Sequence, residues 1–471
     1  FSVLLECDMM WGMSEELQVM NAELAALREE NARLKAEVTR LLAALEEALA
    51  RITELEAASK KPPAFVKRNR PKPSGEKQPR QKRAAEHNTS RKRLPPTRIE
   101  RHALERCPEC QYELHGESID YTREVLELPP PQAVEVIEHQ VIKRWCPHCR
   151  KWHSPQLDLS GQVFGQGRIG KRIASLVVYL RTKLRLPVRQ IQEYLETQHQ
   201  LRLSVGEIVE LTHTVRRALQ PQMDTLLQEV QASPVVHADE TGWRENGQNG
   251  YIWAFLSPTP DPVYYFVYHQ TRAQRIPQGV LGLHFPGHVV SDFYGAYNVI
   301  RGPHQRCWVH LLRDLHDLQE TYATRPEVVL WAQEVRALYD TGKAWLIAHP
   351  APSDAERAAE YDTLLQRACT LGQQYALVPE HPCRALAKRL LRHQDELFQF
   401  VLKPGVPADN NFAERALRPL VIIRKISGGS RSPAGSETRL TLFSLLSTWV
   451  ARGLNPFLHC VDLLQTPAAP P

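Results

Sequence analysis

The sequence predicts a multidomain α+β protein with an N-terminal coiled coil, a zinc ribbon, a helical region and an α/β body. Three observations predict it: a seven-residue apolar repeat, two Cys-x-x-Cys pairs, and a change from helical to extended periodicity after Pro234. At 471 residues with 42% apolar content, the chain can form several cores. A typical domain of about 150 residues gives about three domains.

The first element, over residues 17–58, is a predicted coiled coil. Its two seam positions are filled by Leu17, Leu24, Asn31, Val38, Leu45 and Ile52, and by Met20, Leu27, Leu34, Leu41, Ala48 and Leu55. The polar Asn31 favours a parallel, in-register homodimer, in which the two amides can bond each other. The alternative is a lone amphipathic helix docked on the body, which would carry a wider apolar stripe. Residues 1–16 are expected to be a disordered start.

Residues 59–104 change abruptly to Lys, Arg, Pro and Gln, which predicts a disordered basic linker. Such a linker can track nucleic-acid phosphates, although a merely solvated spacer is the alternative. The net charge of +6 is modest, so the clustering of charge matters more than its sum. No run of 18 or more apolar residues is present, which predicts no membrane span. The odd number of cysteines favours reduced thiols and a cytoplasmic protein.

A predicted zinc-binding module covers residues 105–160. Cys107 and Cys110 form one knuckle and Cys146 and Cys149 the other, so together they can complete a closed, structural four-sulfur site for one Zn²⁺. Two alternating runs between the knuckles predict a hairpin from residues 124–128 and 134–143. The nearby residues His148 and His153 are competing ligands, and a pair of redox dithiols is the alternative chemistry.

Residues 165–228 predict helices over 169–183, 188–197 and 205–219. Ser204 and Glu207 have the spacing of a capping box at the start of the third helix. The short separation of the last two helices resembles a helix-turn-helix, with residues 205–215 as the recognition helix. An ordinary helical bundle shows the same pattern and is the alternative.

Beyond Pro234, two apolar strands each end in an aspartate. The strand from Val235 delivers Asp239, and after two further strands (251–256 and 263–268) and a helix near 272–281, the strand from His288 delivers Asp292. If the last strand pairs beside the first, the two carboxylates meet, and their repulsion invites Mg²⁺ between them. Glu240 would point to the opposite side of the sheet and is left outside this set.

The third candidate acid is Glu414, in a predicted short helix that Asp409 or Asn410 caps and that Pro419 is expected to end. A surface salt bridge between Glu414 and Arg418 is the alternative reading of this helix alone. With Asp239 and Asp292, however, Glu414 would complete a two-metal site for in-line attack on a phosphodiester.

Three blocks, at residues 237–243, 291–297 and 409–419, resemble the motif blocks of the insertion-sequence 66 family of DDE transposases. The resemblance implies a ribonuclease-H-like core in two parts, 229–300 and 404–460, with a helical insertion over 301–403 and a tail over 461–471. It implies a triad that binds two Mg²⁺, with Mn²⁺ as an alternative. Cys307 and His310 match the family's cysteine-histidine pair and are expected to be architectural residues near the site.

The family resemblance implies a protein of the bacterial nucleoid that binds the ends of its element, nicks them and joins the 3′ ends to target DNA. Accessory proteins of the same element are further expected partners. A catalytically inactive DNA-binding regulator and a nuclease that only hydrolyses are the alternatives. The cations expected to contact DNA are Arg415, Arg418, Arg424, Lys425 and Arg431, the last three around a glycine- and serine-rich loop that is either a mobile phosphate-binding loop or a plain surface turn.

Overall fold

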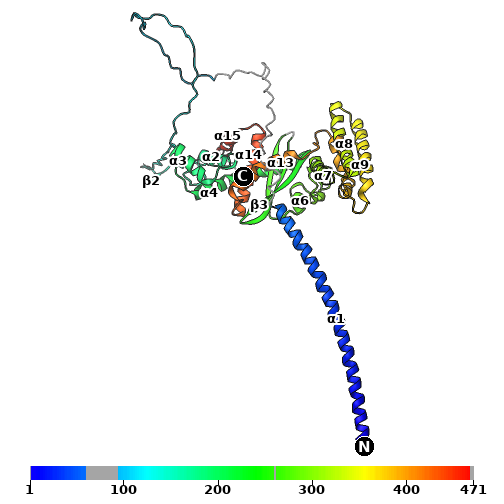
Figure 1. Cartoon of the computed structure of the whole chain (residues 1–471). Helices are drawn as coiled ribbons and strands as arrows, with labels where there is room; N and C mark the ends of the chain where they lie inside the picture. Colours follow the sequence, from blue (N-terminus) through cyan, green and yellow to red (C-terminus); the bar gives the residue numbers. More distant parts are fainter. Residues whose placement is uncertain (1, 60–93, 259–260, 467–471) are drawn as a thin grey trace. The chain divides into compact units, whose positions relative to one another are not determined.

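The computed structural model describes residues 2–59, 94–258 and 261–466. The chain separates into two compact units, Phe1–Leu126 and Glu127–Pro471 (Figure 1). Most of the expected basic linker, residues 60–93, lies outside the described residues. Among the described helices, none combines the length and the apolar character that crossing a bilayer requires.

The first unit contains the single long helix α1 (Ser2–Ser59). It begins upstream of the heptad repeat, so the expectation of a disordered start over residues 1–16 is wrong for residues 2–16. The seam side chains from Met20 to Ile52 are uncovered in this chain; Met20, Leu27 and Leu41 are 60%, 63% and 57% exposed. An apolar seam left in water is costly, which is the physical reason to expect a second chain along it. The dimer itself stays a prediction.

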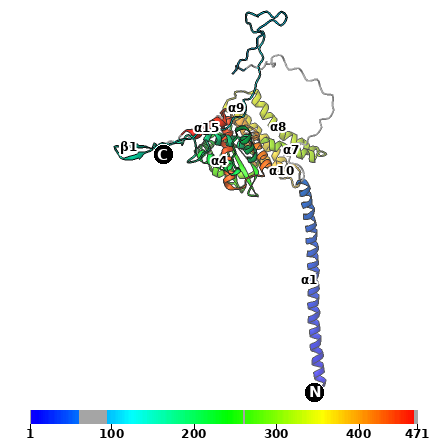
Figure 2. The same cartoon turned by 90° about the vertical axis from the view of Figure 1, so that its left-hand side faces the viewer.

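The second unit begins with a small hairpin, β1 (Arg144–Cys146) paired antiparallel with β2 (Lys151–His153) (Figure 2). The predicted hairpin from residues 124–128 and 134–143 is wrong, because the structure assigns no strand to either run. Their apolar side chains stay in solvent, with Val125 76% exposed and Val136 88% exposed. Alternation stabilises a hairpin only where one face packs on a core, and these runs have no such cover.

The body is built on one sheet with the strand order β5-β4-β3-β6-β7. The strands β3 (Val235–Glu245), β4 (Gln248–Ser257) and β5 (Val263–His269) form the predicted antiparallel meander. The strand β6 (His288–Ser291) pairs in parallel beside β3, as predicted. The short strand β7 (His304–Arg306) extends the parallel side and was not predicted.

The sheet has a different helical cover on each face. One face shares a hydrophobic core with α2 (Lys171–Thr182), α4 (Val205–Ala218), α5 (Gln220–Ala232) and α6 (Arg275–Leu281). The other face packs against α13 (Asn411–Ser427). Helix α14 (Pro433–Ala451) runs along the edge strand β5, where its Ser444 and Thr448 hydroxyls accept hydrogen bonds from the backbone of Phe266 and Tyr264. These bonds protect the edge.

The region expected to be a helix-turn-helix includes α2, α3 (Val188–His199) and α4. The capping box of Ser204 and Glu207 is confirmed. Buried side chains of α2 and α4 belong to the same core as the sheet, and α2 also packs on α15 (Pro456–Gln465). The helical region is therefore part of the body, and residues 461–465 of the expected tail are helical.

The segment between the last two acids is helical, as expected for an insertion. After the 3-10 turn η2 (Gly295–Val299) and β7 it contains α7 (Trp308–Thr321), α8 (Pro326–Ala348), α9 (Asp354–Ala376), α10 (Arg384–Arg392), α11 (Gln394–Leu397) and α12 (Gln399–Leu402). These helices bury a hydrophobic core of their own, centred on Trp308, Trp331 and Phe398. Figure 1 shows them gathered to one side of the sheet.

Candidate active site and zinc centre

The register of two parallel strands places Asp239 and Asp292 side by side. His237 of β3 lies opposite Val290 of β6, and each aspartate follows two residues later. Burial, followed by repulsion from Glu240, Asp292 and Glu414, raises the pKa of Asp239 well above its ordinary value. Asp292 and Glu414 therefore each lie close enough to Asp239 for their charges to act on it, but the oxygens of the three acids do not all lie within 4.8 Å of one another.

The buried side chain of Asn410 fixes the start of α13 against β3. Its Nδ2 donates to the carbonyl of Ala238 at 2.8 Å, and its Oδ1 lies 2.9 Å from Nδ1 of His237. Asn410 is the N-cap residue of α13, but its side chain makes no capping hydrogen bond to that helix. It bonds to β3 instead. Since Ala238 precedes Asp239, Asn410 joins the backbones that carry Asp239 and Glu414. From the sequence alone, Asn410 is predicted only to cap its helix.

Cys307 and His310 both lie next to α13. The buried Sγ of Cys307 accepts the Asn410 backbone N–H at 3.2 Å, and burial raises the pKa of this thiol to about 11, so it stays neutral. His310, in the first turn of α7, places its Nε2 3.8 Å from Oε1 of Glu414. The predicted near-site pair therefore contacts the helix of the third acid.

Arg306 holds the end of β6 where Asp292 leaves the sheet. Its guanidinium is fully buried, and Nη1 donates to the carbonyl of Asp292 at 3.0 Å and to Oγ of Ser291 at 3.1 Å. Nε donates to Oε2 of Glu396 at 2.5 Å, which balances the buried charge. The carboxylate of Asp292 in turn accepts the backbone N–H of Tyr294 at 2.9 Å. The sequence did not predict Arg306, because the short buried strand β7 that carries it was not predicted either.

Glu240 leaves the sheet on the face opposite Asp239, as predicted. It accepts hydrogen bonds from the Tyr297 hydroxyl and from Nε of Arg272, the latter at 2.8 Å. Burial raises the pKa of Glu240 even though these two donors oppose the shift. Its carboxylate is committed to this second network and acts on Asp239 only through charge.

The prediction that Pro419 ends the helix of Glu414 is wrong. α13 continues to Ser427 because its buried apolar face extends beyond the proline, through Leu420 and Ile423. A proline within a helix costs about 3 kcal/mol, whereas each fully buried aliphatic side chain contributes roughly 1.5–3 kcal/mol. Packing of the two side chains offsets the lost hydrogen bond.

The glycine- and serine-rich loop after α13 is hydrogen-bonded to the end of β3, and its role as a mobile phosphate-binding loop stays a prediction. Ser430 pairs with the end of β3, accepting from the Asn246 N–H at 2.9 Å and donating its own N–H to the Arg244 carbonyl at 2.8 Å. Gly429 has φ 114°, and a Cβ there would lie 2.1 Å from the Arg244 oxygen, so the close approach requires glycine. The predicted DNA contact Arg424 donates to the carbonyl of Gly242.

The other four predicted DNA-contacting cations lie on the surface of the same region. Arg415 and Arg418 are exposed on α13, Lys425 is exposed in its last turn, and Arg431 is exposed beyond the loop. Their exposure leaves them accessible to a phosphate backbone.

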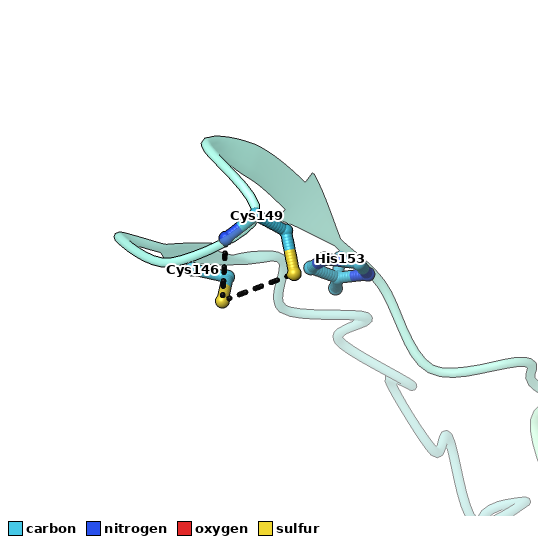
Figure 3. Close-up of side chains that lie close together, drawn as sticks. All are labelled: Cys146, Cys149 and His153. Atoms are coloured by element: carbon cyan, nitrogen blue, oxygen red, sulfur yellow. Dashed lines mark hydrogen bonds between the residues drawn. The ribbon is translucent and has the colours of Figure 1, made fainter.

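Cys146, Cys149 and His153 form a cluster on the β1–β2 hairpin, with one ligand atom from each within 4.8 Å of the others (Figure 3). Cys149 donates its backbone N–H to Sγ of Cys146 at 3.4 Å. Hydrogen bonds from Cys149 and His148 lower the pKa of Cys146, which favours the thiolate that binds zinc. In the other unit, backbone hydrogen bonds from Cys110 and Glu109 lower the pKa of Cys107 in the same way.

Comparison with known families identifies both regions. A family model described as "Transposase IS66 family" matches residues 166–438, more than half of the chain. The chain belongs to the IS66 transposase family. A second model, described as "zinc-finger binding domain of transposase IS66", matches residues 105–150. The IS66 resemblance seen in the sequence is thus confirmed.

Three similar proteins come from Sinorhizobium fredii (strain NBRC 101917 / NGR234). Uncharacterized protein y4jO is 31% identical over 181 residues, which cover 37% of this chain and 52% of that protein. Uncharacterized proteins y4jD and y4qI are each 24% identical, over 52% and 50% of this chain and 53% and 48% of their own lengths. The chain spans about half the length of the curated relatives it matches.

The IS66 zinc-finger match and the hairpin geometry indicate different sets of zinc ligands. The match includes all four cysteines and ends at Arg150, before His153. The hairpin geometry, by contrast, brings His153 to Cys146 and Cys149. Thiolate and imidazole both bind Zn²⁺. His153 therefore competes for one of the two coordination positions that the four-cysteine prediction assigns to Cys107 and Cys110.

Proposed function

We propose that this chain is a DDE transposase that binds the ends of an insertion sequence, nicks them and joins the freed 3′ ends to target DNA. One observation supports the proposal: in an IS66-family chain, the β3–β6 register brings Asp239 beside Asp292, and Asp239 is near enough to Asp292 and Glu414 for their charges to raise its pKa.

The three carboxylates offer the oxygen ligands that divalent cations prefer, although their oxygens do not all lie within 4.8 Å of one another in the structure. Repulsion from Asp292 and Glu414 makes a buried charge on Asp239 unfavourable, and a cation between them reverses this. Oxygen ligands of this kind suit Mg²⁺, with Mn²⁺ as an alternative. Asp239 and Asp292 would hold one ion, and Asp239 and Glu414 the other. When bound, such ions supply Lewis acidity that activates an attacking hydroxyl and stabilises the leaving oxygen.

The chain's own residues position this chemistry. Asn410 sets the distance between the segments of Asp239 and Glu414, and Arg306 fixes the backbone of Asp292. In the first step the oxygen of water forms a bond to phosphorus while the bond to the 3′ oxygen breaks. In the second step that 3′ hydroxyl attacks a target phosphodiester, so one P–O bond again replaces another. No high-energy cofactor is needed.

The remaining parts serve assembly in this proposal. The exposed cations of α13 and its flanking loop bind phosphates near the acids, the structural zinc holds the end-binding module, and the seam of α1 pairs two chains so that two DNA ends are held together. The partners are element ends, target DNA, a second copy of this chain and accessory proteins of the same element, within the nucleoid.

The test is a joining reaction with purified protein, Mg²⁺ and labelled DNA that carries the element's flanking ends. Joined products that disappear in Glu414→Gln, and persist in the control Glu334→Gln on the exposed face of α8, would support the proposal. Cleaved ends without joined products would point to a hydrolysing nuclease. Binding of the ends without cleavage would point to a catalytically inactive regulator.

A further inference from the structure

A small cavity of about 180 Å³ lies where the helical region meets the catalytic helices. The turn between α2 and α3, the middle of α13 and the second half of α14 contribute its walls. The lining residues are Thr182, Lys183, Arg185, Pro419, Phe443, Leu446 and Ser447. The lining therefore combines two cations, two hydroxyl residues and three apolar residues.

Positive charge accumulates around this cavity. Burial, followed by repulsion from Arg185, lowers the pKa of Lys183. Burial, followed by repulsion from Arg181, lowers the pKa of the nearby Arg439 to about 9. The Nε of Arg439 is buried without a hydrogen-bond partner among the described residues, and its guanidinium carbon lies 5.8 Å from the centre of the Trp243 ring.

The turn that carries Lys183 and Arg185 is held rigidly. Nη1 of Arg181 donates to the carbonyl of Leu186 at 2.9 Å, and the Leu186 N–H donates to the carbonyl of Leu180 at 3.1 Å. Arg185 itself has φ 63°, a left-handed conformation that glycine or asparagine adopts at less cost. The fold thus maintains a strained arginine at the cavity, as is often observed at functional sites.

We propose that this cavity binds a phosphate of the DNA backbone, with Lys183 and Arg185 as the direct contacts and Arg181 and Arg439 as the surrounding positive field. Lys183 is exposed and Arg185 is half-buried. Two cations at one cavity are stabilised by an anion between them, and Ser447 offers a hydrogen-bond donor to the same ligand.

The cavity and Glu414 share one helix but not one face of it. Pro419 is five residues beyond Glu414 on α13, which is about 7.5 Å along the axis and about 140° around it. A strand bound at the cavity would therefore pass around α13 to reach the three acids, so the experiment has to decide between DNA and a free anion. This inference rests on the proposed function, because it assigns one phosphate contact of the DNA that the transposase would cleave.

The experiment compares wild type with Lys183→Gln/Arg185→Gln in binding a labelled duplex that carries an element end, without added Mg²⁺, over a range of salt. Loss of this one phosphate contact should reduce the slope of log affinity against log salt by about 1. Affinity at 0.1 M salt should fall roughly 10-fold. The charge-matched control Arg336→Gln/Lys343→Gln, exposed on α8, should retain the wild-type slope, as should the charge-conserving Lys183→Arg/Arg185→Lys.

Two results would overturn the inference while leaving the proposed function intact. The first is joining activity and an unchanged salt slope in Lys183→Gln/Arg185→Gln. The second is a thermal shift with inorganic phosphate that depends on these two residues while DNA affinity does not, which would make the cavity a site for a free anion. Failure of the wild type to cleave or join DNA, with a slope that still depends on the pair, would contradict only the proposed catalysis.

Discussion

The carboxylate site and the cysteine-histidine cluster are built in opposite ways. Cys146, Cys149 and His153 come from one exposed hairpin, and their convergence needs little more than a tight turn. Asp239, Asp292 and Glu414 come from two strands and a helix that are far apart in the chain, and Asn410 and Arg306 hold them in place. The first arrangement depends on local spacing, whereas the second depends on buried contacts between distant segments.

The largest effect is expected from the buried acid. Asp239→Asn should lower cleavage more than about 100-fold, exceeding the loss typical of residues that only support a ligand. The metal-free protein should become more stable to heat, because the amide removes a buried charge repelled by its neighbours. Cleavage assays and melting curves check both effects, and end binding should persist. Cleavage at the wild-type rate with Mg²⁺ would remove Asp239 from the triad.

Next in size is the link between strand and helix. Asn410→Ala should reduce joining by roughly 10- to 100-fold and destabilise the fold by about 1–3 kcal/mol, because the Ala238 carbonyl loses its buried partner. Asn411→Ala, one residue further along, is the matched control. Rates and chemical denaturation of the two variants give the comparison. Equal rates in both variants would mean that α13 is positioned without Asn410.

A smaller effect concerns acid stability. Although burial opposes it, hydrogen bonds from His393 and Arg306 lower the pKa of Glu396 to about 2, below its ordinary value of 4.5. The carboxylate therefore stabilises the fold above pH 4.5, and this contribution is lost as the pH falls from 4.5 toward 2. Unfolding free energies across this range should decrease more steeply for wild type than for Glu396→Gln. Parallel curves for the two proteins would show that the ion pair between Glu396 and Arg306 contributes nothing to the free energy of unfolding.

The smallest effect is expected at the hairpin. With four cysteine ligands, His153→Ala should leave the bound zinc at one per chain, whereas Cys146→Ser should remove it. Metal analysis of the purified variants decides this, and the melting of the catalytic body should change little because the hairpin is exposed. Loss of zinc in His153→Ala would replace one cysteine of the predicted set with this histidine.

Local patterns in the sequence predicted most of the individual elements. The capping box at Ser204, the three-strand meander and the strands that deliver Asp239 and Asp292 agree with the structure because each depends on the order of neighbouring residues. The predicted hairpin before Cys146 is wrong because it too was based on neighbouring residues alone. Alternation of apolar and polar residues does not show whether a core covers one face.

The sequence by itself determined which residue types were available: three acids in recognisable blocks, two cysteine knuckles and an apolar heptad seam. Only the tertiary structure decided that Asn410 would bond β3 rather than its own helix, that α13 would continue through Pro419, and that Lys183 and Arg185 would meet α14 at a cavity. These outcomes depend on burial and hydrogen bonding between residues distant in the chain. Packing, not spacing, selects such contacts.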